Sequence, residues 1–105
     1  MPDRAWKAFE RQAAALFGAT RHWANSGERL DFESPTAVGQ CKLVKTLSLE
    51  SLSVLAEELA VVGKHTEKLG IVCVKCRRGR GKASPMLVVM TSEQFQDWFD
   101  MSSRG

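Results

Sequence analysis

The sequence predicts a single α/β domain in which helices pack against a mixed β-sheet. Stretches with the apolar spacing of amphipathic helices alternate along the chain with short runs of strand-forming residues. One of these runs, at residues 69–76, is almost continuously apolar and rich in β-branched residues, which is typical of a central strand. A chain of 105 residues is long enough for one modest core, so we expect residues 1–105 to form one domain.

The first third of the chain is expected to form a helix and then strands. Residues 4–17 have helical periodicity, and Gly18 is a suitable stop. The apolar stripe of this helix consists of Trp6, Phe9, Ala13, Leu16 and Phe17. A turn at residues 25–27 precedes two short strand candidates at residues 29–33 and 36–42.

The longest helix is expected from about residue 48 to residue 62. Ser48 is a suitable N-cap, and Gly63 fits the C-terminal end. Val54 and Val61 lie on the otherwise polar side and are either scattered surface residues or a second contact stripe. The apolar face is expected to consist of Leu49, Leu52, Leu55, Ala56 and Leu59.

The last third adds two strands and a closing helix. A glycine-containing loop separates the strand at residues 69–76 from a second one at residues 86–90. Thr91 stands three residues before Gln94, a capping-box pattern that predicts the start of a helix. Its apolar face is expected to consist of Phe95, Trp98 and Phe99. The predicted order of elements is α-β-β-β-α-β-β-α.

Composition excludes a membrane-spanning protein. No stretch approaches the roughly 20 apolar residues that a bilayer span requires. The first twelve residues carry charge where a secretory signal would be apolar, and three cysteines form no even disulfide framework. We therefore expect a cytoplasmic protein with reduced thiols.

Polar residues recur on the two neighbouring strand candidates before the long helix. Alternate residues of a strand share a face. Leu30 and Phe32 are therefore expected to point one way, and Asp31 and Glu33 the other. By the same rule Gln40 and Lys42 share a face, opposite Ala37, Gly39 and Cys41.

These polar residues are expected to converge. If a tight turn near Pro35 pairs the two strands antiparallel, Asp31 falls opposite Gln40, with Lys42 on the same face. Oxygen ligands of this kind suit Mg²⁺, and a lysine beside such a cation stabilises charge at a phosphorus centre. The other interpretation is an ordinary exposed face that carries polar residues.

Glu10 lies inside the apolar stripe of the first helix rather than on its solvent side. A carboxylate in that position is costly unless it is paired or ligates a metal. The alternative is that it sits at the edge of the stripe and bends toward solvent.

A concentrated basic loop follows the strand at residues 69–76. The net charge of the chain is only +3, but five cations fall within eight residues with no acid among them. They are Lys75, Arg77, Arg78, Arg80 and Lys82. This density favours contact with a polyanion such as the DNA backbone, although a solvated hairpin tip has the same composition.

The pair Cys73 and Cys76 has the spacing of a half zinc site. On a strand, however, a spacing of three points the two sulfurs to opposite faces, and the chain has no second pair. We therefore expect buried cysteines that fill the core.

Together these residues resemble the PD-(D/E)xK nuclease superfamily. The pattern is an acid on the first helix, an acid on one strand and a triplet on the next, which here reads Glu10, Asp31 and Gln40-Cys41-Lys42. The resemblance covers roughly residues 4–76. The size and arrangement are most similar to archaeal and phage Holliday junction resolvases, and the QCK triplet is similar to that of Mrr-type endonucleases.

The resemblance implies a restriction-endonuclease-like αβββαβ core and a prokaryotic or phage-encoded enzyme. Asp31, Gln40 and the backbone carbonyl of Cys41 would hold one or two Mg²⁺ ions, and Mn²⁺ is expected to substitute. Lys42 would position the attacking water, and Glu10 would act on a metal through its waters.

The resemblance also implies a DNA substrate and a dimer. Arg21 and Ser26 fall near where resolvases place residues close to the scissile phosphate. Resolvases act as homodimers on four-way junctions. The stripe of Val54 and Val61 is one candidate for the interface, and Trp98 and Phe99 are the alternative. The resemblance thus implies a metal-dependent endodeoxyribonuclease that acts on branched DNA.

Two departures and two alternatives accompany this expectation. Leu30 stands where many members have proline, and Gln40 stands where resolvases usually have glutamate, so cation binding is expected to be weaker. One alternative is a restriction- or repair-type endonuclease of the same fold. The other is a DNA-binding module that no longer cleaves.

Overall fold

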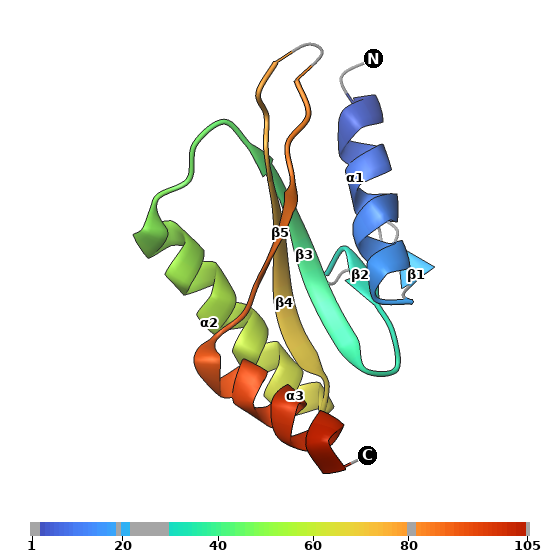
Figure 1. Ribbon diagram of the computed structural model, residues 1–105, viewed down its shortest axis with the longest axis vertical. Coiled ribbons are helices and arrows are strands. Elements are labelled where there is room, and N and C mark those ends of the chain that lie inside the picture. Colours follow the sequence, from blue (N-terminus) through green and yellow to red (C-terminus); the bar gives the residue numbers. More distant parts are fainter. Residues whose placement is uncertain (1–2, 19, 22–29, 80–81, 105) are drawn as a thin grey trace.

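A five-stranded mixed sheet lies at the centre of the protein, with helices packed against it (Figure 1). The computed structural model describes residues 3–18, 20–21, 30–79 and 82–104. The predicted order α-β-β-β-α-β-β-α is confirmed, although no residues were assigned to the first of its strands. The elements are α1 (Asp3–Leu16), β1 (Thr20–Arg21), β2 (Phe32–Glu33), β3 (Ala37–Val44), α2 (Leu49–Thr66), β4 (Leu69–Cys76), β5 (Met86–Val89) and α3 (Ser92–Arg104).

The strands lie in the sheet in the same order as in the chain. β3 and β4 are parallel, joined through α2, and every other neighbouring pair is antiparallel. The parallel register pairs Gln40 with Val72 and Lys42 with Val74. Because parallel strands end at the same edge of a sheet, the loops after β3 and β4 leave from one end of the molecule.

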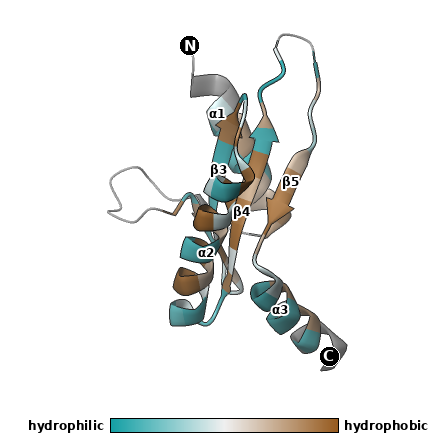
Figure 2. Ribbon diagram, turned by 90° about the vertical axis from the view of Figure 1, so that its left-hand side faces the viewer, coloured by the Kyte–Doolittle hydropathy of each residue, from teal (hydrophilic) through white to brown (hydrophobic). Residues whose placement is uncertain are grey.

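The two faces of the sheet are covered by different helices. Ile71 and Cys73 of β4 belong to a buried cluster with Phe9 and Ala13 of α1. Val72 and Val74, which alternate with them, pack in a second cluster with Leu59 of α2. The continuous apolar run of β4 is therefore explained by burial on both faces, as the sequence predicted. Figure 2 shows β4 and β5 as largely hydrophobic, whereas the end of β4 is hydrophilic.

The long helix α2 begins as predicted and ends later. Ser48 is the N-cap, and its Oγ accepts from the backbone N–H of Ser51 at 3.1 Å. The predicted stop at Gly63 is wrong, because the helix continues until Glu67 adopts a left-handed conformation with φ 60°. Gly63 is instead required by close packing, since a Cβ there would lie 2.5 Å from the carbonyl oxygen of Lys68. Leu49 is 78% exposed and does not belong to the apolar face predicted for it.

The closing helix α3 is capped as predicted but presents its aromatic residues to solvent. Thr91 Oγ1 accepts from the N–H of Gln94 at 3.2 Å. The side chain of Gln94 does not return to Thr91, because its Oε1 accepts from the N–H of Gly70 at 2.7 Å and ties α3 to β4. Phe95 and Phe99 are about half exposed, so the predicted apolar face is not part of the core. None of the helices in the described part of the chain combines the length and apolar character of a membrane span.

Candidate active site

Asp31 lies where β2 separates from β3. Its N–H donates to the carbonyl of Gly39 at 2.8 Å, and its Oδ2 accepts from the N–H of Cys41 at 2.7 Å. In a continuing antiparallel ladder, a backbone carbonyl of the neighbouring strand would accept from the N–H of Cys41. Here the carboxylate of Asp31 accepts from it instead. The register pairs Phe32 with Gly39, and the N–H of Asp31 also donates to the carbonyl of Gly39, so Asp31 lies against Gly39 and not, as predicted, opposite Gln40.

The chain bends at Asp31, and one predicted alternation fails there. Phe32 is buried in the cluster beneath α1, whereas Leu30 packs in the cluster beneath α2. The prediction that Leu30 and Phe32 share a face is therefore wrong. The physical reason is that β2 contains only two residues, so the strand period does not extend back to Leu30. The bend is what allows the Asp31 carboxylate to lie in the gap between the two strands.

Glu10 reaches this gap from α1. It is only 9% exposed, so of the two interpretations that the sequence left open, burial within the stripe is confirmed. Its Oε2 accepts from Nε1 of Trp6 at 2.8 Å, one helical turn earlier. Its carboxylate also lies within hydrogen-bonding contact of Asp31. Two acidic side chains from different elements therefore meet at one half-buried point.

The packing that brings Glu10 to Asp31 depends on Gly39. The ring of Phe32 lies directly over it, since a Cβ on Gly39 would stand 2.1 Å from Cζ of Phe32. Phe17, just after α1, stacks on the same ring with centroids 5.5 Å apart. Because Phe32 adjoins Asp31, this stack fixes the end of α1 close to the gap between β2 and β3.

The electrostatic environment of Asp31 disfavours a second negative charge. Burial and the nearby Glu10 carboxylate raise the pKa of Asp31 above its ordinary value. The N–H of Cys41 and the ammonium of Lys42 oppose this rise but do not cancel it. Adjacent carboxylates in this situation either share a proton or bind a cation.

Gln40 and Lys42 lie on the face of β3 that was predicted for them. Cys41 is buried beneath α1, and Val44 packs beneath α2, so the alternation places Gln40 and Lys42 on the α2 side. Both are half-buried, and Oε1 of Gln40 is fully enclosed. The structure thus brings Glu10 and Asp31 into contact and sets Lys42 within electrostatic range of Asp31. Gln40 lies on the α2 side of β3, whereas α1, which carries Glu10, covers the other side.

The available donors fit a hard cation that is only partly held by protein. The described residues contain no cluster of three or more histidine, cysteine, aspartate or glutamate side chains suited to a metal. Magnesium, however, is usually bound through one or two carboxylates plus waters and substrate phosphates. The Glu10 and Asp31 carboxylates meet that requirement, and amide or carbonyl oxygens of Gln40 and Cys41 are neutral donors of the appropriate kind.

The predicted basic residues occupy the end of the molecule where β3 and β4 finish. Figure 1 shows the segment between β4 and β5 rising at this end, beside the start of α1. Arg77 and Lys82 are exposed there. Lys75 is held against α1, with Nζ 3.3 Å from Oε1 of Gln12, and Arg78 donates to the carbonyl of Ala83 at 3.2 Å.

Three predicted residues are only partly described or not described. The backbone of Arg21 pairs with Phe32, one residue from Asp31, while Ser26 and Arg80 lie outside the described residues. Of the two core cysteines that were predicted on β4, Cys73 is buried, and burial raises the pKa of its thiol to about 12. Cys76 is exposed because it ends the strand, so that part of the prediction is wrong.

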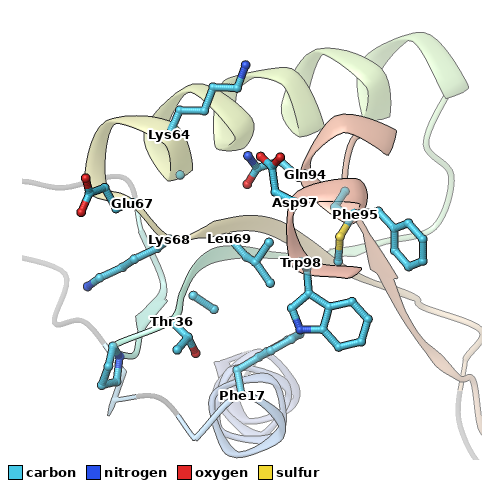
Figure 3. Close-up of a pocket in the computed structure, with 14 residues that line it drawn as sticks. Phe17, Thr36, Lys64, Glu67, Lys68, Leu69, Gln94, Phe95, Asp97 and Trp98 are labelled. Atoms are coloured by element: carbon cyan, nitrogen blue, oxygen red, sulfur yellow. The ribbon is translucent and has the colours of Figure 1, made fainter. Parts of the chain in front are cut away.

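The sequence interpretation missed two features. Trp6 was counted only as an apolar residue, although its spacing of four from Glu10 was available as a sign of a side-chain contact. A cavity of about 980 Å³ also lies at the opposite end of the sheet from the basic residues. Figure 3 shows Trp98 of α3 and Phe17 on one side of this cavity, with Lys64 of α2 and Glu67, which follows α2, on the other. Its lining residues come from four separate elements, so no local sequence pattern predicts the cavity.

Comparisons of the chain with protein-family models, with curated proteins and with solved structures find no match.

Proposed function

We propose that the protein is a metal-dependent endodeoxyribonuclease that hydrolyses phosphodiesters of branched DNA, as a Holliday junction resolvase does. The observation that carries the proposal is the contact between the carboxylates of Glu10 and Asp31 at the point where β2 leaves β3. A half-buried pair of acids is unfavourable in itself, so a cation is the simplest reason to keep it.

Each residue of the site has a distinct role in the proposed reaction. Glu10 and Asp31 would hold Mg²⁺, with oxygens of Gln40 and Cys41 as additional donors. When bound, the ion supplies positive charge against the scissile phosphate. Lys42, whose ammonium lowers the pKa of Asp31, orients the attacking water and stabilises negative charge that develops on the phosphorus centre. The Cys41 N–H keeps Asp31 in place.

Contact with the DNA backbone is assigned to the basic end of the molecule. Arg77 and Lys82 are exposed beyond the ends of β3 and β4, on the same edge as Lys42. Lys75 is hydrogen-bonded to Gln12 of α1, so we expect it to add to the positive electrostatic potential at this end rather than to contact a phosphate directly. Backbone contacts of this kind position a duplex without reading its sequence, which suits recognition by shape.

The proposed partner besides DNA is a second copy, bound through the aromatic face of α3. Phe95, Trp98 and Phe99 are 48%, 44% and 53% exposed and form one cluster. A fully buried aromatic side chain removes about 150–250 Å² from solvent, so three half-exposed ones still expose about 300 Å² per copy. A symmetric dimer could therefore bury about 600 Å² of aromatic surface. With a polar rim, that approaches the roughly 1,000 Å² of a stable interface.

The position of α3 supports the same partner. Figure 1 places α3 at the far end from the segment between β4 and β5. A dimer joined through α3 therefore leaves the DNA-binding end of each copy open.

The proposal is tested with a labelled four-way junction and a matched linear duplex, each with Mg²⁺, Mn²⁺ or EDTA. Asp31→Asn removes the charge at the site, and Glu58→Gln on the exposed surface of α2 is the control. Paired nicks on the junction alone, lost with EDTA and with Asp31→Asn, are expected. Equal cutting of both DNAs would instead assign a restriction- or repair-type nuclease of the same fold.

A second candidate function is a DNA-binding module without cleavage. It is favoured by the neutral Gln40 and by the lack of a three-residue metal cluster among the described residues. Binding to the junction with no nicks in either metal, at protein concentrations that saturate the DNA, would select this function.

A further inference from the structure

Trp6 is fixed against the carboxylate that α1 brings to the site. Its Nε1 lies 2.8 Å from Oε2 of Glu10, and the spacing of four residues places both side chains on one face of the helix. The ring is also held edge-on to Phe9, with centroids 6.5 Å apart. An indole N–H is a donor only, so it engages a carboxylate oxygen and offers nothing to a cation.

This contact affects how Glu10 can bind a cation. A carboxylate binds a metal either through one oxygen or through both. Because the indole engages Oε2, a geometry in which both oxygens face the same cation competes with this hydrogen bond. Magnesium demands a compact octahedral shell, whereas calcium takes six to eight oxygens and readily accepts both oxygens of one carboxylate.

We infer that Trp6 is a positioning residue that restricts Glu10 to one-oxygen binding and so makes the site favour Mg²⁺ over Ca²⁺. The inference rests on the proposed function, because it requires Glu10 to bind a cation. Donors that orient a metal ligand commonly change metal affinity by about 10- to 100-fold when they are removed.

The test is calorimetric titration of the purified protein with Mg²⁺ and, separately, with Ca²⁺. Trp6→Phe keeps the ring beside Phe9 and deletes the donor, and Glu58→Gln on the exposed surface of α2 is the control. We expect the ratio of Ca²⁺ to Mg²⁺ dissociation constants to fall about tenfold in Trp6→Phe and to stay unchanged in Glu58→Gln. Trp6→Gln, which restores an N–H donor one turn before Glu10, is expected to recover part of the ratio.

The outcomes separate this inference from the proposed function. Magnesium binding by the wild type with an unchanged ratio in Trp6→Phe would overturn the inference and leave the function standing. No cation binding by the wild type would overturn both.

Should Trp6→Phe fail to fold, the wild type decides by NMR. The Trp6 indole proton is expected to remain protected from solvent exchange at saturating Mg²⁺. Loss of that protection when Mg²⁺ binds would mean that the hydrogen bond is absent from the loaded site, and would equally overturn the inference.

Discussion

Replacing Asp31 by asparagine or by alanine should separate the structural role of this residue from its role toward a cation. In the wild type, Oδ2 of Asp31 accepts from the N–H of Cys41 at 2.7 Å. Asparagine keeps a side-chain oxygen that can accept this hydrogen bond. Alanine leaves that N–H without its acceptor, which typically costs about 1–3 kcal/mol. The asparagine variant also removes a charge that burial and Glu10 disfavour. We therefore expect Asp31→Ala to lose about 2 kcal/mol of unfolding free energy and Asp31→Asn to be at least as stable as the wild type.

The pH dependence of this difference follows from the raised pKa of Asp31. The folded protein holds the Asp31 proton more tightly than the unfolded chain, whose value is near 3.8. The wild type therefore loses stability from this residue as pH rises from about 3.8 through the higher folded value, and the loss is complete above it. The gain in unfolding free energy of Asp31→Asn over the wild type should therefore be absent at pH 3 and constant near pH 7.

Thermal melts with and without Mg²⁺ measure both effects. At ten times the dissociation constant, Mg²⁺ should stabilise the wild type by about 1.4 kcal/mol, which raises the melting temperature of a domain of this size by roughly 6 °C. It should stabilise neither variant. If Asp31→Asn were as unstable as Asp31→Ala, the charge would be stabilising and the electrostatic reasoning wrong. If Mg²⁺ raised the melting temperature of Asp31→Asn as much as that of the wild type, Asp31 would not be a ligand.

Three further changes test separate parts of the structure. Gly39→Ala should lose about 2 kcal/mol in urea unfolding, because its Cβ would overlap the Phe32 ring, and an unchanged midpoint would contradict that packing. At pH 8 a thiol reagent should modify exposed Cys76 quickly and Cys73 only after denaturation, because burial raises the pKa of Cys73 to about 12. Rapid labelling of a Cys76→Ser variant would contradict the burial of the remaining thiols. Phe99→Ser should shift light-scattering mass from dimer to monomer with at least a roughly 30-fold weaker association, while Mg²⁺ binding is unchanged; a wild type that is monomeric at high concentration would refute the α3 interface.

Local patterns predicted the elements but not their tertiary contacts. The Ser48 cap and the buried β4 strand followed from the sequence because caps and apolar runs act over a few residues. Gly63 was assigned as a helix stop because glycine often ends helices. Its actual role is to let α2 approach Lys68 and Gly70, a contact that depends on how the chain folds back from α2 into β4.

The candidate site was predictable in part for the same reason. The antiparallel pairing of the two strands and the shared face of Gln40 and Lys42 needed only a tight turn and the strand period, and both are local. The contact of Glu10 with Asp31 depends on how α1 is rotated against the sheet. That rotation is set by Phe32 lying over Gly39 and stacking on Phe17, which the period of α1 alone does not specify.

The glutamine of the triplet offers the sharpest remaining test of what the site is for. Gln40 Oε1 is fully enclosed, so Gln40→Glu places a new charge in a site that already disfavours the charge of Asp31. Without metal, we expect the variant to melt at least about 4 °C below the wild type, and Gln40→Met, which adds no charge, to melt closer to it. With Mg²⁺, the third carboxylate should tighten cation binding about tenfold or more and restore the melting temperature. Restored stability accompanied by faster junction cleavage would mean that Gln40 moderates an active enzyme. Restored stability without cleavage would mean that the cation site serves DNA binding alone, and no response to Mg²⁺ would remove Gln40 from the ligand set.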